Sequence, residues 1–256
     1  MNKLPALTLA FWVMKICATT LGETAGDLLS MTLDVGYAVS SLILVSLFLV
    51  SLGAQLRARS HHPALYWTVI LATSTAGTTM SDFMDRTLGL GYATGSAILI
   101  GILLATFAAW YLSEKSLAVD NIHSRRGELF YWVAILFSNT LGTALGDYLA
   151  DDSGLGFAGS ALLIGSLIAV VALARYFTRI SPVALFWLAF VLTRPFGATL
   201  GDFLTKLPAN GGVGFGTIGS SAVLAGTLAV LVAFAVRNRL REPVVIPAAI
   251  ATSPRG

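Results

Sequence analysis

An acidic residue recurs four times in this chain, each time at the end of a long apolar segment. In each copy a Trp precedes the Asp by 15 residues, and the copies begin 55, 65 and 55 residues apart. The pairs are Trp12 and Asp27, Trp67 and Asp82, Trp132 and Asp147, and Trp187 and Asp202. Placing a carboxylate in such a segment costs free energy, so such residues are usually functional. The chain therefore repeats one unit four times, and each copy places an acid inside a membrane.

Apolar runs of about 20 residues follow one another along the whole chain, as in helical membrane proteins. The 256 residues are 56% hydrophobic and 11% charged, whereas soluble domains carry about 25% charged residues. The runs at 42–52 and 161–174 are continuous and do not alternate, which excludes an outer-membrane barrel. We predict an all-α membrane protein of eight transmembrane helices, built from four parallel helical-hairpin repeats around a pseudo-symmetric centre.

Each repeat is predicted to hold two helices joined by a short turn that follows the Asp. The predicted spans are 6–31, 37–56, 64–86, 92–113, 128–150, 157–178, 182–205 and 215–236. The repeats at about 6–56, 64–113, 128–178 and 182–236 make one transmembrane domain over 1–236, and 237–256 is predicted to be a basic cytoplasmic tail.

The distribution of Lys and Arg predicts the orientation. The loops between repeats and the two ends of the chain carry twelve of them, and the turns within repeats carry two, Arg86 and Lys206. Because cytoplasmic loops are enriched in these residues, we expect a bacterial inner (plasma) membrane protein with both termini cytoplasmic. The four Trp residues then mark the cytoplasmic interface, and each Asp lies about 22 Å from its Trp, toward the outside.

The first helix of every repeat carries one polar stripe. Steps of four residues back from each Asp stay on one helix face. They meet Glu23, Thr19 and Lys15 in the first repeat, Thr78 and Ser74 in the second, Thr143 and Asn139 in the third, and Ala198 and Arg194 in the fourth. Small residues at GxxxG spacing run beside the stripe and allow helices to approach closely. We therefore expect these four helices to pack around a common centre with their stripes inward.

The stripe offers the donors of a hard cation site. The candidate metal ligands or proton carriers are Glu23, Asp27, Asp82, Asp147 and Asp202, and the supporting oxygens are those of Thr19, Thr78, Asn139 and Thr143. Lys15 and Arg194 are expected to form ion pairs with this cluster and to leave it with a charge of about −3. Pro195 is expected to loosen its helix near the middle. The lone Cys17 excludes a disulfide framework.

The four in-register G-x-x-x-[GS]-D segments resemble those of an uncharacterised bacterial family of multi-pass inner-membrane proteins, over residues 8–236. The segment from Glu23 to Asp27 is also similar to the Glu-x-Gly-Asp motifs of manganese and calcium exporters of the GDT1 type. The second resemblance implies efflux of a divalent cation with Glu23 and Asp27 as ligands.

We expect a secondary transporter that exports a divalent metal cation, manganese before calcium or magnesium, in exchange for protons. Two alternatives stay open: a cation channel with an Asp ring, and a non-transporting membrane scaffold or sensor. The sequence has no phosphate-binding loop and no nucleophile–base motif, so we expect no enzyme and no covalently bound cofactor. The expected partners are the lipid bilayer, the metal ion and protons, without nucleic acid; a homo-oligomer stays open.

Overall fold

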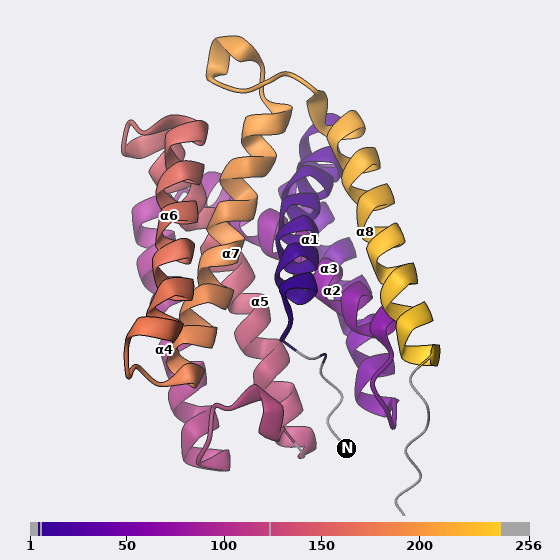
Figure 1. Ribbon diagram of the computed structural model, residues 1–256. Coiled ribbons are helices and arrows are strands. Elements are labelled where there is room, and N and C mark those ends of the chain that lie inside the picture. The colour runs from indigo at the N-terminus through magenta and orange to yellow at the C-terminus, as the bar shows by residue number, and fades with distance from the viewer. Residues whose placement is uncertain (1–4, 6, 123, 242–256) are drawn as a thin grey trace, which may run out of the picture.

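The chain folds into long helices connected by short turns (Figure 1). The computed structural model describes residues 5, 7–122 and 124–241, and within this part of the chain there are eight long helices and no strand. They are α1 (Leu9–Asp27), α2 (Tyr37–Arg57), α3 (Pro63–Asp82), α4 (Tyr92–Glu114), α5 (Arg125–Asp147), α6 (Gly156–Phe177), α7 (Pro182–Thr205) and α8 (Gly216–Arg241). All eight predicted spans correspond to these helices. The last helix continues five residues past its predicted end at 236, and residues 242–256 of the predicted tail lie outside the described residues.

Local sequence signals account for several helix starts. The Thr8 hydroxyl accepts a hydrogen bond from a backbone N–H in the first turn of α1, and Ser124 does the same for α5, which satisfies donors that have no partner within the helix. Pro182 begins α7, where its missing N–H costs nothing. Gly36 precedes α2 with a φ of 79°, a backbone conformation that other residues rarely adopt.

The first three repeats continue past the Asp into one turn of π-helix. These turns are η1 (Leu28–Thr32), η2 (Phe83–Thr87) and η4 (Tyr148–Asp152). The fourth repeat has a longer connection, with a short 3₁₀ turn, η5 (Pro208–Asn210), that projects beyond the other turns in Figure 1. A second 3₁₀ turn, η3 (Val119–Asn121), precedes α5. The Asp of the first three repeats is therefore the last α-helical residue, at a junction of a kind often found at functional sites.

The first helices of the four repeats form a closed inner ring. α1 packs on α3, α3 on α5, α5 on α7, and α7 on α1. Burial follows this arrangement, because 67% of the apolar segment of α5 is buried but only 17% of that of α2. The prediction that these four helices surround a common centre is confirmed.

Glycine makes this ring tight. Each inner helix presents a Gly to the polar stripe of the following inner helix, and a Cβ at any of these positions would come closer than 3.0 Å to that helix. The facing pairs are Gly22 with Ser74, Gly77 with Asn139, Gly142 with Arg194, and Gly197 with Thr19. The small residues at GxxxG spacing therefore act as predicted, and they bring the polar stripes into direct contact.

The outer helices do not pack as the sequence suggested. α2 packs on α3, α4 on α5, α6 on α7, and α8 on α1, so each outer helix covers the inner helix of the next repeat. The predicted hairpin within each repeat is thus not the main packing unit, because the turn after each Asp carries the chain across to the neighbouring inner helix. α8 closes the circle against α1. In Figure 1, α4 and α6 lie on one side of the ring and α2 and α8 on the other.

Six of the helices in the described part of the chain are long and apolar enough to cross a bilayer: α2, α4, α5 with its η4 extension, α6, α7 and α8. α1 includes Lys15, Glu23 and Asp27, and α3 is rich in Thr and Ser. Both lie in the inner ring, where neighbouring helices and not lipid surround their polar side chains. The structure is that of a multi-pass membrane protein.

At Gly77 the nearest atoms of the neighbouring helix belong to its backbone. A Cβ there would meet the backbone of Asn139 and Thr140 at 2.9 Å, and backbone cannot turn aside as a side chain can. We expect Gly77→Ala to destabilise the protein by about 1–3 kcal/mol, measured by unfolding in mixed micelles. Gly101→Ala is the control, since a Cβ there meets nothing within 4 Å. Equal stability of the two variants would contradict the tight ring.

Candidate functional site

The polar stripes meet along the axis of the inner ring and form successive layers. One layer holds Asp27, Asp82, Asp147 and Asp202, and the next holds Glu23, Thr78, Thr143 and Ala198. Every one of these side chains is buried. The four Asp residues lie close together, because two bridging cations and the approach of Asp147 to Asp202 link them.

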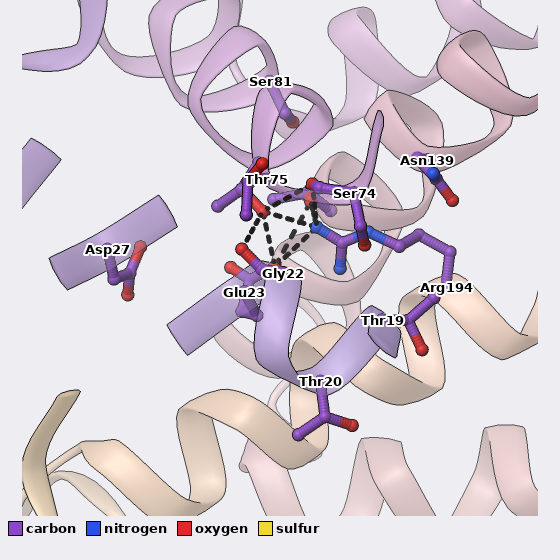
Figure 2. A network of polar contacts seen from close by, with 12 residues as sticks. Thr19, Thr20, Gly22, Glu23, Asp27, Ser74, Thr75, Ser81, Asn139 and Arg194 are labelled. Carbon is purple, nitrogen blue, oxygen red and sulfur yellow. Dashed lines mark hydrogen bonds and ion pairs between the residues drawn. The ribbon is translucent and has the colours of Figure 1, made fainter. Parts of the chain in front are cut away.

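Arg194 of α7 lies at the centre of the ring. Its Nη2 donates to Glu23 Oε2 at 2.9 Å, to Thr78 Oγ1 at 2.6 Å and to Thr143 Oγ1 at 2.7 Å. These acceptors come from α1, α3 and α5, so a single side chain contacts all three other inner helices. Figure 2 shows Arg194 reaching toward Glu23 and Ser74, with Asp27 apart from this network. The predicted ion pair of Arg194 with the acid cluster is confirmed.

Lys15 lies further from the Asp residues along the axis of the ring, and it does not form the ion pair predicted for it. Its Nζ donates to Asn139 Oδ1 at 3.4 Å and lies 4.1 Å from the centre of the Phe190 ring. No carboxylate in the described part of the chain lies within ion-pair distance of this nitrogen. The reason is geometric, since Glu23 lies two turns further along α1 and is bound by Arg194.

Two basic residues, which were predicted only as residues of the turns, form ion pairs with the acids. Arg86 bridges Asp82 at 3.0 Å and Asp147 at 3.2 Å. Lys206 bridges Asp202 at 3.1 Å and Asp27 at 3.1 Å. Each follows the Asp of its own helix by four residues, a spacing that puts two side chains on one face; this spacing was the signal that could have identified them.

The bridges divide the four Asp residues into two pairs, each held by one cation between neighbouring helices. Burial lowers the pKa of the Lys206 ammonium, but Asp202 and Asp27 outweigh this effect and raise it above its usual value. Lys206 is therefore a fixed positive charge at physiological pH. The five acids and four basic groups of the site carry a formal charge of −1, in place of the −3 expected without Arg86 and Lys206.

Three carboxylates from different helices come close enough to share one ion. Oxygen atoms of Glu23, Asp147 and Asp202 all lie within 4.8 Å of one another, and all three residues are buried. Asp27 and Asp82, also predicted as ligands, lie outside this group and bind Lys206 and Arg86. The structure thus brings together three of the five predicted ligands.

The supporting polar residues also divide into two sets. The hydroxyls of Thr78 and Thr143 lie 3.3 and 3.4 Å from Glu23 Oε2. Thr19 instead donates to backbone carbonyl groups, including that of Thr193 on α7, and Asn139 binds Lys15 and Thr73. Only Thr78 and Thr143 among the predicted supporting residues therefore contact a predicted ligand within the described residues.

The acid end of the ring opens into a cavity of about 290 Å³. Its lining includes Arg86, Asp151, Asp202, Lys206 and Asn210. Asp202 therefore connects the buried carboxylates with the outside of the bundle. An ion that enters from this end would pass both bridging cations before it reaches Glu23.

The opposite end is closed by two rows of aromatic side chains. Phe11 packs on Trp67, Tyr66 on Trp132, Tyr131 on Trp187, and Phe186 on Trp12, with ring centres 5.5–6.1 Å apart. The Tyr66 and Tyr131 hydroxyls are joined at 2.7 Å. The ring is thus open at its acid end and filled at its aromatic end.

Three of the four Trp residues predicted to mark the cytoplasmic interface are buried inside the protein. Trp67, Trp132 and Trp187 are at most 6% exposed, because they lie on inner helices that the outer helices cover. Trp12 is half-buried. Pro195, expected to loosen α7, lies inside a continuous helix, and Thr199 donates to its carbonyl oxygen at 3.0 Å.

Carboxylate and hydroxyl oxygens are the donors that magnesium, calcium and manganese prefer. The site can bind a cation in competition with its own basic residues, or exchange protons at its acids.

Comparison with known proteins gives the family but no relative of known activity. No curated protein and no solved structure matches the chain significantly. The Repeat of Unknown Function (DUF347) matches residues 10–61, 65–116, 130–181 and 185–240. These matches begin 55, 65 and 55 residues apart, as the Trp–Asp units do, and they cover most of the sequence. The chain therefore belongs to the DUF347 repeat family.

Proposed function

We propose that this protein is a secondary transporter of a divalent metal cation, manganese before calcium or magnesium, that exchanges the metal for protons. The observation that carries the proposal is the convergence of Glu23, Asp147 and Asp202 from three inner helices beside a cavity. Three buried carboxylates within 4.8 Å repel one another unless cations or protons neutralise them, so the group favours the binding of positive charge.

Glu23, Asp147 and Asp202 would be the ligands, and Thr78 and Thr143 would add oxygens. Each of these ligands binds a basic side chain in the structure: Glu23 binds Arg194, Asp147 binds Arg86 and Asp202 binds Lys206. An entering metal would have to displace all three, and we propose that they replace the metal between transport cycles and keep the buried carboxylates neutralised. Asp27 and Asp82 would carry protons when their bridging cations move.

We further propose that all eight helices span the bacterial inner membrane, with α1 and α3 shielded from lipid inside the ring. The enrichment of Lys and Arg at the aromatic end supports cytoplasmic termini. The acid end would then face outward. The likeness of the Glu23–Asp27 segment to metal exporters supports the same substrate class, although Asp27 is bound to Lys206 and apart from the three-carboxylate group.

The side chains along the axis of the inner ring favour a carrier over a channel. Arg194 contacts all three other inner helices at its level, Lys15 reaches from α1 to α5, and the aromatic rows close one end. A carrier needs such a closed end in each of its states, whereas an open pore needs a continuous path. Single-channel currents would favour the channel instead.

We expect Glu23→Gln and Asp147→Asn each to weaken manganese binding at least about tenfold, because each removes one charged ligand. Isothermal titration of the purified protein measures binding, and uptake of a panel of divalent ions into proteoliposomes measures transport. Asp152→Asn is the control, since Asp152 is exposed on the same side of the bundle. If wild-type protein neither binds nor moves any ion of the panel, the scaffold or sensor alternative takes the place of the transporter.

Arg194→Gln should have the opposite effect on binding. Without the guanidinium competing for Glu23, manganese should bind roughly tenfold more tightly, while exchange across the membrane slows because nothing displaces the ion. Arg194→Lys keeps the charge and should retain part of the exchange. Binding and flux are measured on the same preparation, with an unfolding curve to verify the fold. Weaker binding in a folded Arg194→Gln protein would contradict the role of Arg194 as a competing cation.

A further inference from the structure

A second cavity, distant from the acids, lies on the outer surface between α4 and α5. Its volume is about 620 Å³, and its lining includes Ala105, Ala109 and Ser113 of α4 and Arg126, Leu129 and Phe130 of α5. The small residues of α4 recur every four positions and leave space along that helix, while larger apolar residues of α5 line the opposite side. The cavity is therefore an elongated groove along the two helices.

The groove offers almost no polar group along its length. The hydroxyl of Thr106, which also lines it, donates to the carbonyl oxygen of Ile102 in its own helix at 2.8 Å. From Ile102 to Ser113 the groove runs about 16 Å at 1.5 Å per residue. That is half of a hydrocarbon core of about 30 Å. Its occupant is thus apolar and confined to one leaflet.

One end of the groove carries a basic side chain, Arg126, whereas the acids at the same end of α4 and α5 that face the bundle, Glu114 and Glu128, are half-buried and buried. Arg126 is exposed and forms no hydrogen bond or ion pair with any described residue, so its charge is available to a ligand. Arg125 and Lys115 are exposed at the same end of α4 and α5. A ligand with a negative charge at the membrane surface could form ion pairs with these basic side chains.

We propose that this groove binds one phospholipid with an anionic headgroup, with an acyl chain between α4 and α5 and its phosphate at Arg126. The headgroup lies in the leaflet at the aromatic end of the inner ring. A transmembrane helix of a second copy would extend through both leaflets and would place an apolar surface against Arg126, so the length and the charge both favour lipid. This site is independent of the proposed transport activity.

The test compares lipid binding by the full-length protein in non-ionic detergent. Native mass spectrometry counts bound phosphatidylglycerol and phosphatidylcholine, and thermal unfolding reports the stabilisation that each lipid gives. Arg126→Gln removes the charge and Ala109→Trp fills the groove. The matched controls are Arg175→Gln, an exposed arginine in the last turn of α6, and Ala108→Trp, exposed on α4 but outside the groove lining.

We expect wild-type protein to hold one phosphatidylglycerol in preference to phosphatidylcholine, and Arg126→Gln to weaken its binding roughly fivefold. Ala109→Trp should abolish this one binding event, while both controls bind as wild type does. All four positions are exposed, so the variants should unfold at the wild-type temperature without lipid.

Three results would overturn the proposal. The first is equal binding of the two lipids, and the second is an equal loss in Arg175→Gln, which would indicate attraction to any surface charge. The third is efficient disulfide formation between two copies carrying Ala109→Cys in a Cys17→Ser background in membranes, because a second copy would then occupy the groove. A transport defect in the carboxylate variants would leave these outcomes unchanged.

Discussion

The close contact between inner helices at glycine is the constraint on which the rest of the structure depends. A Gly on each helix lets the polar stripe of the next helix approach more closely than a residue with a Cβ atom would permit. Because this happens four times around a circle, the stripes meet at the axis and lipid is excluded from them. Charged groups there depend on partners within the bundle, and Arg194, Arg86 and Lys206 each bind an acid of another inner helix.

The ion pairs follow from that constraint, and they are arranged with twofold and not fourfold regularity. Only the second and fourth repeats carry a basic residue one turn after the Asp, and each of these residues reaches the Asp of the following helix. The longer linker between the second and third repeats matches this division of the chain. A buried charge without its partner is costly, so the pairs also restrict which helix can stand beside which.

The periodic pattern of residues predicted the helices, the inner ring and the burial of the stripe, because these depend on spacing along one helix. It did not predict which outer helix covers which inner helix, since that depends on how the turn after each Asp leads the chain away. Nor did it predict that Trp67 and Trp132 are buried, since their burial depends on the outer helices that cover them. The four-residue spacing from Asp202 to Lys206 would have predicted their ion pair, because it places both side chains on one helix face.

The contact of α8 with α1 joins the last helix of the chain to the first. During synthesis α1 leaves the ribosome long before the helix that will cover it, and it carries Lys15, Glu23 and Asp27 on a surface that lipid solvates poorly. Its neighbours α3 and α7 also arrive later. If α1 spans the membrane as we propose, it has to remain in a protected or partly inserted state until the circle can close.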